Sequence, residues 1–294
     1  MPDTVEICPL CGVNTSSLFD QRVFRDHPVS NRICHHCGLV YQSPRMTASE
    51  SQVFYESEYR RLYQGQEGPN AKDLAVQAAR AQITLDFVCK WVKSSPYILD
   101  IGCSSGVLLQ QLQAYYQAQA FGVEPGTVYR NYAQSSGLVV YPSLEELEQE
   151  KVPHFNLISM MHVLEHLPDP VHYLRHLREN LLEQDGWLLV EVPNLYAHDC
   201  FEVAHLISFS AHSLSQVIQK AGFRPIQLRS HGQPRSRLIP LYLTLLAQPD
   251  SNPVYSFKPD RYVRIKRQIG FLQRRLVERL LPQRAWLSPG TNIV

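Results

Sequence analysis

The strongest constraint on the fold is an apolar strand that runs through a glycine-containing turn into a helix. Residues 97–109 read Tyr-Ile-Leu-Asp-Ile-Gly-Cys-Ser-Ser-Gly-Val-Leu-Leu, with Asp100 in the strand and Gly102 and Gly106 bracketing the turn. Glycine lets a ligand approach the backbone more closely than a Cβ atom would permit. Glu124 ends the next apolar run, about 20 residues on, where a carboxylate can accept hydrogen bonds from both hydroxyls of a ribose.

Apolar runs alternate with helical patterns between residues 71 and 247, which predicts a Rossmann-like, doubly wound, mostly parallel α/β sheet. Strands are expected at Tyr97–Ile101, Ala120–Glu124, Asn156–Met161, Trp187–Val192, Pro225–Arg229 and Leu238–Ala247. Helices are expected at 71–93, Val107–Gln117, Val128–Ser135, Pro170–Leu182 and Leu214–Ala221. The connection at 230–236 is short enough to join the last two strands as an antiparallel hairpin at the sheet edge.

Two cysteine pairs stand near the N-terminus, each with two residues between the thiols and a glycine after the second. The four cysteines are Cys8, Cys11, Cys34 and Cys37. Two such turns can direct four thiolates at one cation, which predicts a small zinc-ribbon-like module. Four protein ligands leave no open coordination position, so this zinc is assigned to structure. Free or disulfide-linked cysteines are the alternative.

The overall composition narrows the class of protein. The 294 residues allow one α/β domain with smaller additions, and 28 Lys plus Arg balance 27 Asp plus Glu. This near-neutral charge gives no global attraction to nucleic acid, which weighs against a nucleic-acid partner. The first residues lack a signal-peptide pattern and no apolar run is long enough to span a membrane, so we expect a cytoplasmic protein.

The motifs together resemble the class I S-adenosylmethionine-dependent methyltransferases. Asp100–Gly106 is similar to the first motif of that family, Glu124 to the second, residues 155–170 to the fourth, and 182–194 to the strand region after it. The resemblance implies S-adenosylmethionine as cofactor over the carboxyl edge of the sheet. The implied cofactor-binding residues are Asp100, Gly102, Cys103, Gly106, Glu124, Met161 and His162. A nicotinamide dehydrogenase is the competing interpretation, but the turn lacks the full GxGxxG pyrophosphate cradle.

Three catalytic candidates directly follow the strand at 156–161, namely His162, Glu165 and His166. The stretch resembles the Met-Glu-x-Leu-Glu-His segment of ubiquinone-pathway O-methyltransferases, whose acidic residues there can hold a divalent ion. His162 takes the place of one carboxylate, and imidazole is a poor ligand for a hard cation such as magnesium. Alternatively, Glu165 and His166 cap and orient the turn before the helix at Pro170.

His205 is the fourth catalytic candidate. Its segment, Ala204-His-Leu-Ile-Ser-Phe-Ser210, resembles that of sugar C-methyltransferases, which also carry an N-terminal four-cysteine zinc module. The resemblance implies that His205 is a general base, a task that suits an imidazole near neutral pH. The alternative is a histidine that only fills the core or a loop.

The segment between the cysteine-rich and sheet-forming regions is rich in aromatic residues. Phe54, Tyr55, Tyr59 and Tyr63 follow a helical spacing. In zinc-headed methyltransferases this part of the chain lies across the mouth of the active site, so these side chains are candidates for an acceptor pocket. Ordinary packing is the alternative.

The C-terminal region predicts a basic amphipathic helix between Lys258 and Leu281. Its apolar positions are Tyr262, Ile265, Ile269, Leu272, Leu276 and Leu280, surrounded by arginines and lysines. Such a helix can lie on a membrane surface or bind a polyanion. We expect it instead to dock on its own domain or on a second subunit, which leaves a homodimer open.

The sequence thus divides into a zinc-binding module (1–45), an aromatic linker or lid (46–70), a methyltransferase domain (71–250) and the basic tail (251–294). The expected activity is methyl transfer to oxygen or carbon of a small-molecule acceptor, such as a nucleotide-linked sugar, a glycan or a secondary metabolite. The alternatives are an RNA or protein methyltransferase that uses the zinc module for recognition, and a non-catalytic cofactor-binding module.

Overall fold

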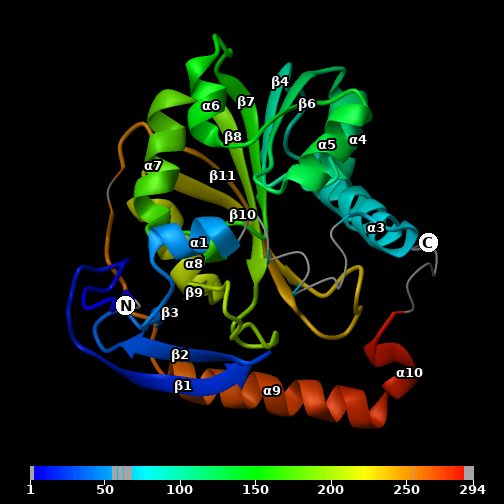
Figure 1. The fold of residues 1–294 in the computed structure, drawn as a ribbon. Coiled ribbons are helices and arrows are strands. Elements are labelled where there is room, and N and C mark those ends of the chain that lie inside the picture. The colour runs from blue at the N-terminus through cyan, green and yellow to red at the C-terminus, as the bar shows by residue number, and fades with distance from the viewer. Residues whose placement is uncertain (1–2, 55–57, 59–61, 63–67, 254, 288–294) are drawn as a thin grey trace.

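A seven-stranded sheet forms the centre of the molecule in the computed structural model, which describes residues 3–54, 58, 62, 68–253 and 255–287 (Figure 1). Its strand order is β10-β11-β8-β7-β4-β5-β6. The strands are β4 (Tyr97–Ile101), β5 (Gln119–Val123), β6 (Val139–Tyr141), β7 (Phe155–Met161), β8 (Leu182–Pro193), β10 (Phe223–His231) and β11 (Tyr242–Pro249).

The sheet is parallel from β8 through β7 and β4 to β5 and β6, so these strands end at one shared edge. The last strand, β11, lies between β8 and β10 and is antiparallel to both. The predicted α/β sheet with an antiparallel hairpin at its edge is therefore confirmed, with β10 outermost. Because β11 takes an inner place, it is almost completely buried, with only its last two residues half-exposed.

Helices cover both faces of this sheet (Figure 1). Phe87, Leu109 and Ala133 belong to one apolar cluster, and Leu147, Leu174 and Leu214 belong to another. The first group comes from α3 (Ala71–Val88), α4 (Val107–Tyr116) and α5 (Thr127–Ser135), and the second from α6 (Leu144–Gln149), α7 (Pro170–Asn180) and α8 (Ala211–Lys220). This is the doubly wound arrangement that the alternating pattern predicts.

Element boundaries follow the prediction closely in the first half of the sheet. β4 has the predicted bounds, and α4 and α5 differ from the prediction by one residue. The sequence interpretation missed β6 and α6, because a three-residue strand such as Val139–Tyr141 carries too few positions to show a period. The predicted strand at 238 starts only at Tyr242, because residues 232–241 form an irregular connection after β10.

The N-terminal region forms a second, four-stranded sheet of order β1-β2-β3-β9. It contains β1 (Ser16–Phe24), β2 (His27–Cys34), β3 (Val40–Gln42) and β9 (Ile207–Ser208). The last of these strands comes from the sheet-forming region of the chain and pairs antiparallel with β3. Residues of the cysteine pairs also belong to the main apolar cluster of the central sheet. The two sheets are therefore joined by strand pairing and by a shared core.

The short helix α1 (Ala48–Val53) follows the N-terminal sheet and begins with a capping box between Thr47 and Glu50. Phe54 is buried against Val29, Val203 and Ala204. Tyr55, Tyr59 and Tyr63 of the aromatic segment lie outside the described residues.

The basic helix of the C-terminal region is α9 (Val263–Leu280), followed by α10 (Pro282–Ala285). Asp260 anchors the start of this region: its backbone N–H donates to Cys37, and its buried carboxylate accepts from Tyr196, Ser210 and Lys266. Helix α9 lies along β1 and the loop after β8 (Figure 1). None of the helices in the described parts of the chain is long and apolar enough to cross a membrane.

Candidate active site

The glycine-containing turn lies at the carboxyl end of β4 and leads directly into α4. Gly102 and Gly106 have φ angles of 73° and 79°, which favour glycine. A Cβ atom added to Gly102 would lie 2.5 Å from the side chain of Val163. One added to Gly106 would lie 2.2 Å from the side chain of Leu138. Backbone conformation and internal packing therefore require both glycines, in addition to the ligand approach inferred from the sequence.

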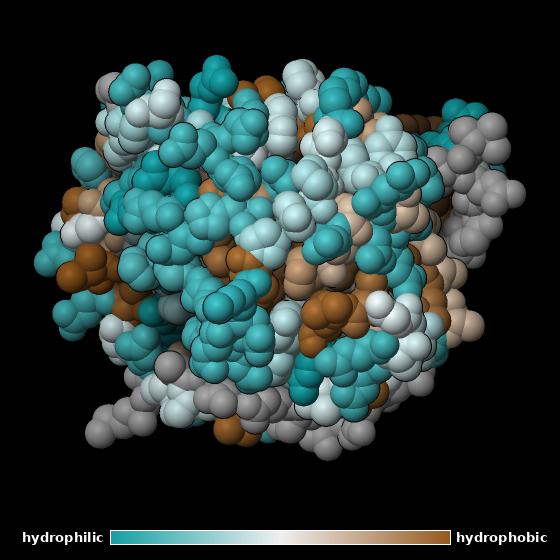
Figure 2. Space-filling view, turned by 90° about the horizontal axis from the view of Figure 1, so that it is seen from above, coloured by the Kyte–Doolittle hydropathy of each residue, from teal (hydrophilic) through white to brown (hydrophobic). Residues whose placement is uncertain are grey.

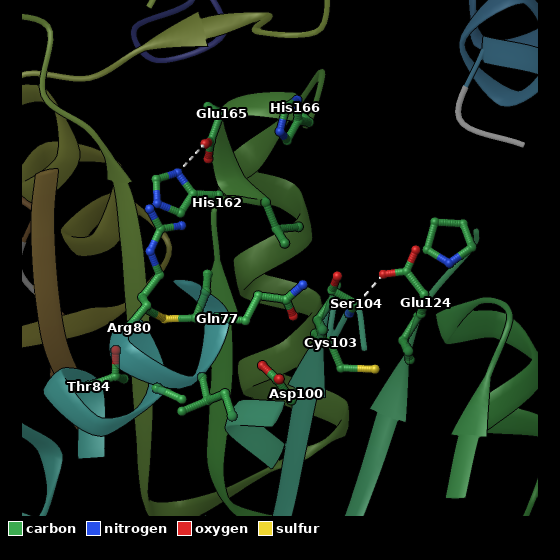
Figure 3. Close-up of a pocket in the computed structure, with 18 of the residues that line it drawn as sticks. Gln77, Arg80, Thr84, Asp100, Cys103, Ser104, Glu124, His162, Glu165 and His166 are labelled. Atoms are coloured by element: carbon green, nitrogen blue, oxygen red, sulfur yellow. Dashed lines mark hydrogen bonds and ion pairs between the residues drawn. The ribbon is translucent and has the colours of Figure 1, made fainter. Parts of the chain in front are cut away.

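The Glu124 carboxylate connects this turn to the next one. Its Oε2 accepts a hydrogen bond from the backbone N–H of Ser104 at 2.9 Å, and its Oε1 accepts from Gly126 at 3.0 Å (Figure 3). A carboxylate offers about four acceptor positions, so backbone groups can orient it while it also contacts a ligand. The side chain lies just after β5, beside the turn that follows β4, as the sequence predicts.

Asp100 is buried in β4 and accepts a 2.6 Å hydrogen bond from the hydroxyl of Ser159. Burial raises the pKa of its carboxyl to about 7; Ser159 opposes this shift, and the negative charge of Glu124 adds to it. A carboxyl group whose pKa is near 7 loses its proton readily when a cation binds nearby. Asp100 and Glu124 are thus two neighbouring acidic groups at this edge of the sheet.

His162 lies between two buried carboxylates. Its Nδ1 is 3.3 Å from Oε1 of Glu165 (Figure 3), and its Nε2 is 3.2 Å from Oε1 of Glu191. Burial and Arg80 lower the pKa of His162, but the two glutamates outweigh them and raise it. With both ring nitrogens next to carboxylates, His162 links the end of β7 to Glu191 on β8.

Glu191 is the centre of a wider polar network. Its Oε2 accepts a 2.8 Å hydrogen bond from Thr244 and lies 3.2 Å from Nε2 of His231. Burial would raise the pKa of Glu191, but His162, His231 and Arg80 hold it well below the ordinary value. The network therefore fixes the ends of β7, β8, β10 and β11 relative to one another.

His166 and His205 face each other across a tilted contact, with ring centroids 5.0 Å apart. In each ring Nδ1 is hydrogen-bonded to a backbone carbonyl, that of Ala204 at 2.8 Å and that of Cys200 at 2.9 Å. A carbonyl can only accept, so Nδ1 carries the proton and the lone pair of the neutral ring is on Nε2. Burial lowers the pKa of His166 to about 4, which keeps this ring neutral near pH 7.

Glu165 completes this group. One donor atom from each of Glu165, His166 and His205 lies within 4.8 Å of the others. Burial would raise the pKa of Glu165, but the neighbouring His162, His166 and His205 lower it to about 2, so the carboxylate is ionised. We refer to these three residues as the Glu-His-His group.

The N-terminal sheet holds the segment that carries His205. The backbone N–H of Gln42, in β3, donates to Leu206, and the N–H of Leu206 donates to Glu165, both at 2.8 Å. The side-chain amide of Gln42 also donates to the carbonyl of Glu202. The position of His205 therefore depends on strand pairing with the cysteine-rich region.

A cavity of about 620 Å³ joins these features, which is within the usual size of small-molecule sites. All four predicted catalytic residues line it. Six of the seven predicted cofactor residues do so too, namely Asp100, Gly102, Cys103, Glu124, Met161 and His162. Gly106 instead faces Leu138 and Ala133 in the core.

The sequence interpretation missed several lining residues. Among them are Gln77 and Arg80 on α3 (Figure 3), His198 after β8, and Tyr242 on β11. Glu191, at the centre of the polar network, could have been singled out from the sequence, because its carboxylate interrupts an otherwise apolar strand. The other residues carry no such signal, because they reach the cavity only through the packing of α3 and the inner position of β11.

The four N-terminal cysteines form a second cluster, apart from the cavity. Their sulfur atoms all lie within 4.8 Å of one another, with Cys8 and Cys37 at 3.5 Å and Cys11 and Cys34 at 3.4 Å. No disulfide joins them. Sulfurs at the corners of a tetrahedral zinc site lie roughly 3.8 Å apart, as follows from Zn–S bonds of about 2.3 Å.

Residues 74–228 match the family model described as methyltransferase domain. The match covers more than half of the 294 residues, and it spans both the turn after β4 and the Glu-His-His group. The chain belongs to this family of methyltransferase domains.

Among similar curated proteins are ubiquinone biosynthesis O-methyltransferases. That of Nitrosospira multiformis is 33% identical over 104 residues, which cover 33% of this chain and 43% of that protein. That of Actinobacillus pleuropneumoniae is 32% identical over 108 residues, covering 33% of this chain and 45% of that protein. The chain therefore matches less than half of the length of these relatives.

Two solved structures show the same fold. A 1,6-didemethyltoxoflavin-N1-methyltransferase from Burkholderia thailandensis, with bound S-adenosylhomocysteine, has a TM-score of 0.56 at 15% identity, covering 79% of this chain and all of that chain. An S-adenosylmethionine-dependent methyltransferase from Archaeoglobus fulgidus has a TM-score of 0.50 at 16% identity, covering 65% of this chain and 97% of that chain. At these identities the likeness concerns the fold.

The buried histidines predict a loss of stability in acid. Burial lowers the pKa of His166 to about 4 and that of His198 to about 3, whereas the unfolded chain protonates histidine near 6.5. The free energy of unfolding should therefore fall as the pH drops from about 6.5 towards 4. His166→Asn should flatten this slope by up to about 1.4 kcal/mol per pH unit in urea denaturation.

The matched control is His154→Asn, which changes an exposed histidine in the loop before β7. An equal slope for His166→Asn and the parent protein would contradict a neutral, buried imidazole at this position.

Proposed function

We propose that this protein transfers a methyl group from S-adenosylmethionine to oxygen or carbon of a small-molecule acceptor. The observation that carries the proposal is a single cavity that is lined both by Glu124 and the turn after β4 and by His166 and His205, whose Nδ1 atoms are hydrogen-bonded to backbone carbonyls. Membership in the family of methyltransferase domains supports it.

The residues around the turn fit the cofactor. Glu124 is oriented to accept the ribose hydroxyls, as its counterpart does in nucleoside-binding sheets. Asp100 and Glu124 supply negative charge beside a ligand that carries a sulfonium cation. Bound S-adenosylmethionine supplies an activated methyl group, so the protein mainly has to align the acceptor with it and exclude water.

Proton removal from the acceptor is assigned to His205. Its Nδ1–H is held by the carbonyl of Cys200, so Nε2 is the atom that takes the proton from a hydroxyl or a carbon acid. Glu202 lies 3.9 Å from that Nε2 and can stabilise the imidazolium that forms. His166 and Glu165 orient the acceptor beside it, whereas His162, held between Glu165 and Glu191, has the role of a positioning residue.

A divalent cation is the second candidate role for the Glu-His-His group. One ionised carboxylate and two imidazoles, each anchored through Nδ1, form a donor set suited to a borderline cation such as Zn²⁺ or Mn²⁺. The cation would polarise an acceptor hydroxyl. Magnesium fits this set poorly, because it prefers oxygen ligands.

The four-cysteine cluster is proposed to hold a structural zinc ion. Four thiols within reach of one cation, without a disulfide, match the donor set of a closed site. Leu39 N–H donates to the sulfur of Cys37, a bond that would stabilise a thiolate. Through β3, the same module supports the segment of His205.

The cofactor assignment is tested by isothermal calorimetry with S-adenosylhomocysteine. Glu124→Ala should weaken binding roughly ten- to a hundredfold, because charge-assisted hydrogen bonds are worth about 1.5–3 kcal/mol. Glu145→Ala, on the exposed side of α6, is the control. Thermal unfolding without ligand separates loss of binding from loss of the turn. Equal affinity in both variants, or no binding by the parent protein, would refute the assignment.

The role of His205 is tested by release of S-adenosylhomocysteine across a panel of phenols, sugar nucleotides and carbon acids. We expect His205→Gln to lower kcat by about 10²–10⁴ while cofactor affinity stays unchanged. His154→Asn is the control. If chelation abolishes activity of the parent and Mn²⁺ restores it, the cation role replaces the base role. A kcat for His205→Gln equal to that of the parent would exclude both roles for this side chain.

The zinc assignment is tested by elemental analysis of the purified protein. Cys11→Ser should lose zinc and several kcal/mol of stability, because metal binding is coupled to folding of such modules. Cys89→Ser, at the end of α3, should keep both. Activity of Cys11→Ser should also fall, since β3 supports His205. Zinc-free parent protein with unchanged thermal unfolding would count against a structural metal.

A further inference from the structure

Helix α9 carries a continuous apolar stripe on its outward side. The stripe consists of Tyr262, Ile265, Ile269, Leu272, Leu276 and Leu280. Their exposed fractions lie between 47% and 72%, although a helix of a globular protein usually buries its apolar stripe. At 100° per residue these positions span roughly a quarter of the helix circumference. The stripe is therefore a coherent surface.

The inward side of α9 combines arginines with the apolar residues Val263, Phe271 and Val277, whereas the helix leaves most of its isoleucines and leucines on the outward side. Arg264 donates to backbone carbonyls of β1, Arg267 to those of Leu195 and His198, and Arg274 to that of Ala197. Val263 is buried, and a Cβ atom on Gly270 would lie 2.0 Å from the carbonyl oxygen of Tyr196.

These contacts fix the rotation of α9. Turning the stripe inward would break the arginine bonds and would move a larger side chain into the place of Gly270. The expected docking of α9 on its own domain therefore occurs, but through the basic side, and it leaves the apolar side exposed.

Positive charge accompanies the stripe. Arg275 and Arg279 are exposed along one flank of α9, and Arg261 is exposed just before the helix. None of the three forms an ion pair with another described residue. The only acid in the sequence of α9 is Glu278, which is paired with Arg274 at 3.0 Å. The outward face thus combines apolar side chains with a row of arginines.

We propose that the outward face of α9 docks the protein on an anionic lipid surface. Apolar side chains with flanking arginines fit the boundary between acyl chains and negatively charged headgroups, where such helices lie in the plane of the interface. Tyr262, at the start of the helix, is a residue type that favours this boundary.

A second copy of this chain fits the face less well. Packing two α9 stripes antiparallel places the row of Arg261, Arg275 and Arg279 against its own copy, and no acid on either helix compensates. Parallel packing brings that row towards Lys266 and its partner Asp260, a buried carboxylate that already accepts from Lys266, Tyr196 and Ser210. Like charges at such a seam destabilise pairing, so charge complementarity selects a negative partner.

The end of the molecule opposite α9 has a different distribution of hydrophobic residues on its surface. Figure 2 shows that end, where hydrophilic residues predominate and hydrophobic ones are scattered. Single exposed apolar side chains need no partner, whereas a contiguous stripe does.

The candidate active site is linked to α9, because His198 lines the cavity while its backbone carbonyl accepts a hydrogen bond from Arg267.

The proposal is tested by co-sedimentation of the full-length protein with vesicles. The probes are phosphatidylcholine alone and phosphatidylcholine mixed with phosphatidylglycerol. We expect binding to the mixed vesicles, weakened by salt, and little binding to phosphatidylcholine. Ile269→Glu and Leu272→Glu should each weaken partitioning about tenfold or more. Arg275→Gln with Arg279→Gln should weaken it about 25-fold, at about fivefold for each arginine.

Two matched controls keep the test specific. Val139→Glu changes an exposed apolar residue on β6, and Arg175→Gln changes an exposed arginine on α7; both should bind vesicles as the parent does. Far-ultraviolet circular dichroism checks that every variant is folded. Equal binding to both vesicle types, or none to either, would overturn the proposal. So would a lipid-free dimer that Leu272→Glu converts to a monomer, since the stripe would then be the subunit interface.

Discussion

The arrangement of the cavity depends on one carboxylate, that of Glu124, which accepts N–H bonds from Ser104 and Gly126. These two donors belong to the turns after β4 and β5, so a single side chain fixes the spacing of both turns. Parallel pairing of β4 with β5 and β7 then brings the acids and the histidines to the same edge. Every chemical role proposed for this protein requires that edge to be rigid.

The sequence predicts the parts of the site that are formed by one short segment. It does not predict the parts that are assembled from segments distant in the chain. Residues 97–109 specify a strand, a turn and a helix within a few residues, so the part of the cavity formed by the turn after β4 could be predicted. The network around Glu191 could not, because it needs His162, His231 and Thr244 from three other strands. Its geometry follows from the insertion of β11 between β8 and β10, which no local pattern encodes.

The cysteine-rich region is more closely connected to the central sheet than its sequence suggests. Composition changes sharply near residue 45, but β3 pairs with β9, and the cysteine pairs share an apolar cluster with the central sheet. The hydrogen bonds from Gln42 to Leu206 and from Leu206 to Glu165 carry this connection into the cavity. The cysteine-rich region can therefore affect the position of His205, although none of its described residues lines the cavity.

Helix α9 shows why amphipathic pattern alone does not decide which side of a helix faces the protein. A helical wheel gives the stripe and the arginines, but the choice of side depends on what the neighbouring surface offers. Here that surface presents backbone carbonyls of Leu18, Phe19, Leu195 and Ala197, which can only accept hydrogen bonds. Arginine can donate to these carbonyls and leucine cannot, so the side of α9 that carries arginines faces them and the apolar stripe faces outward.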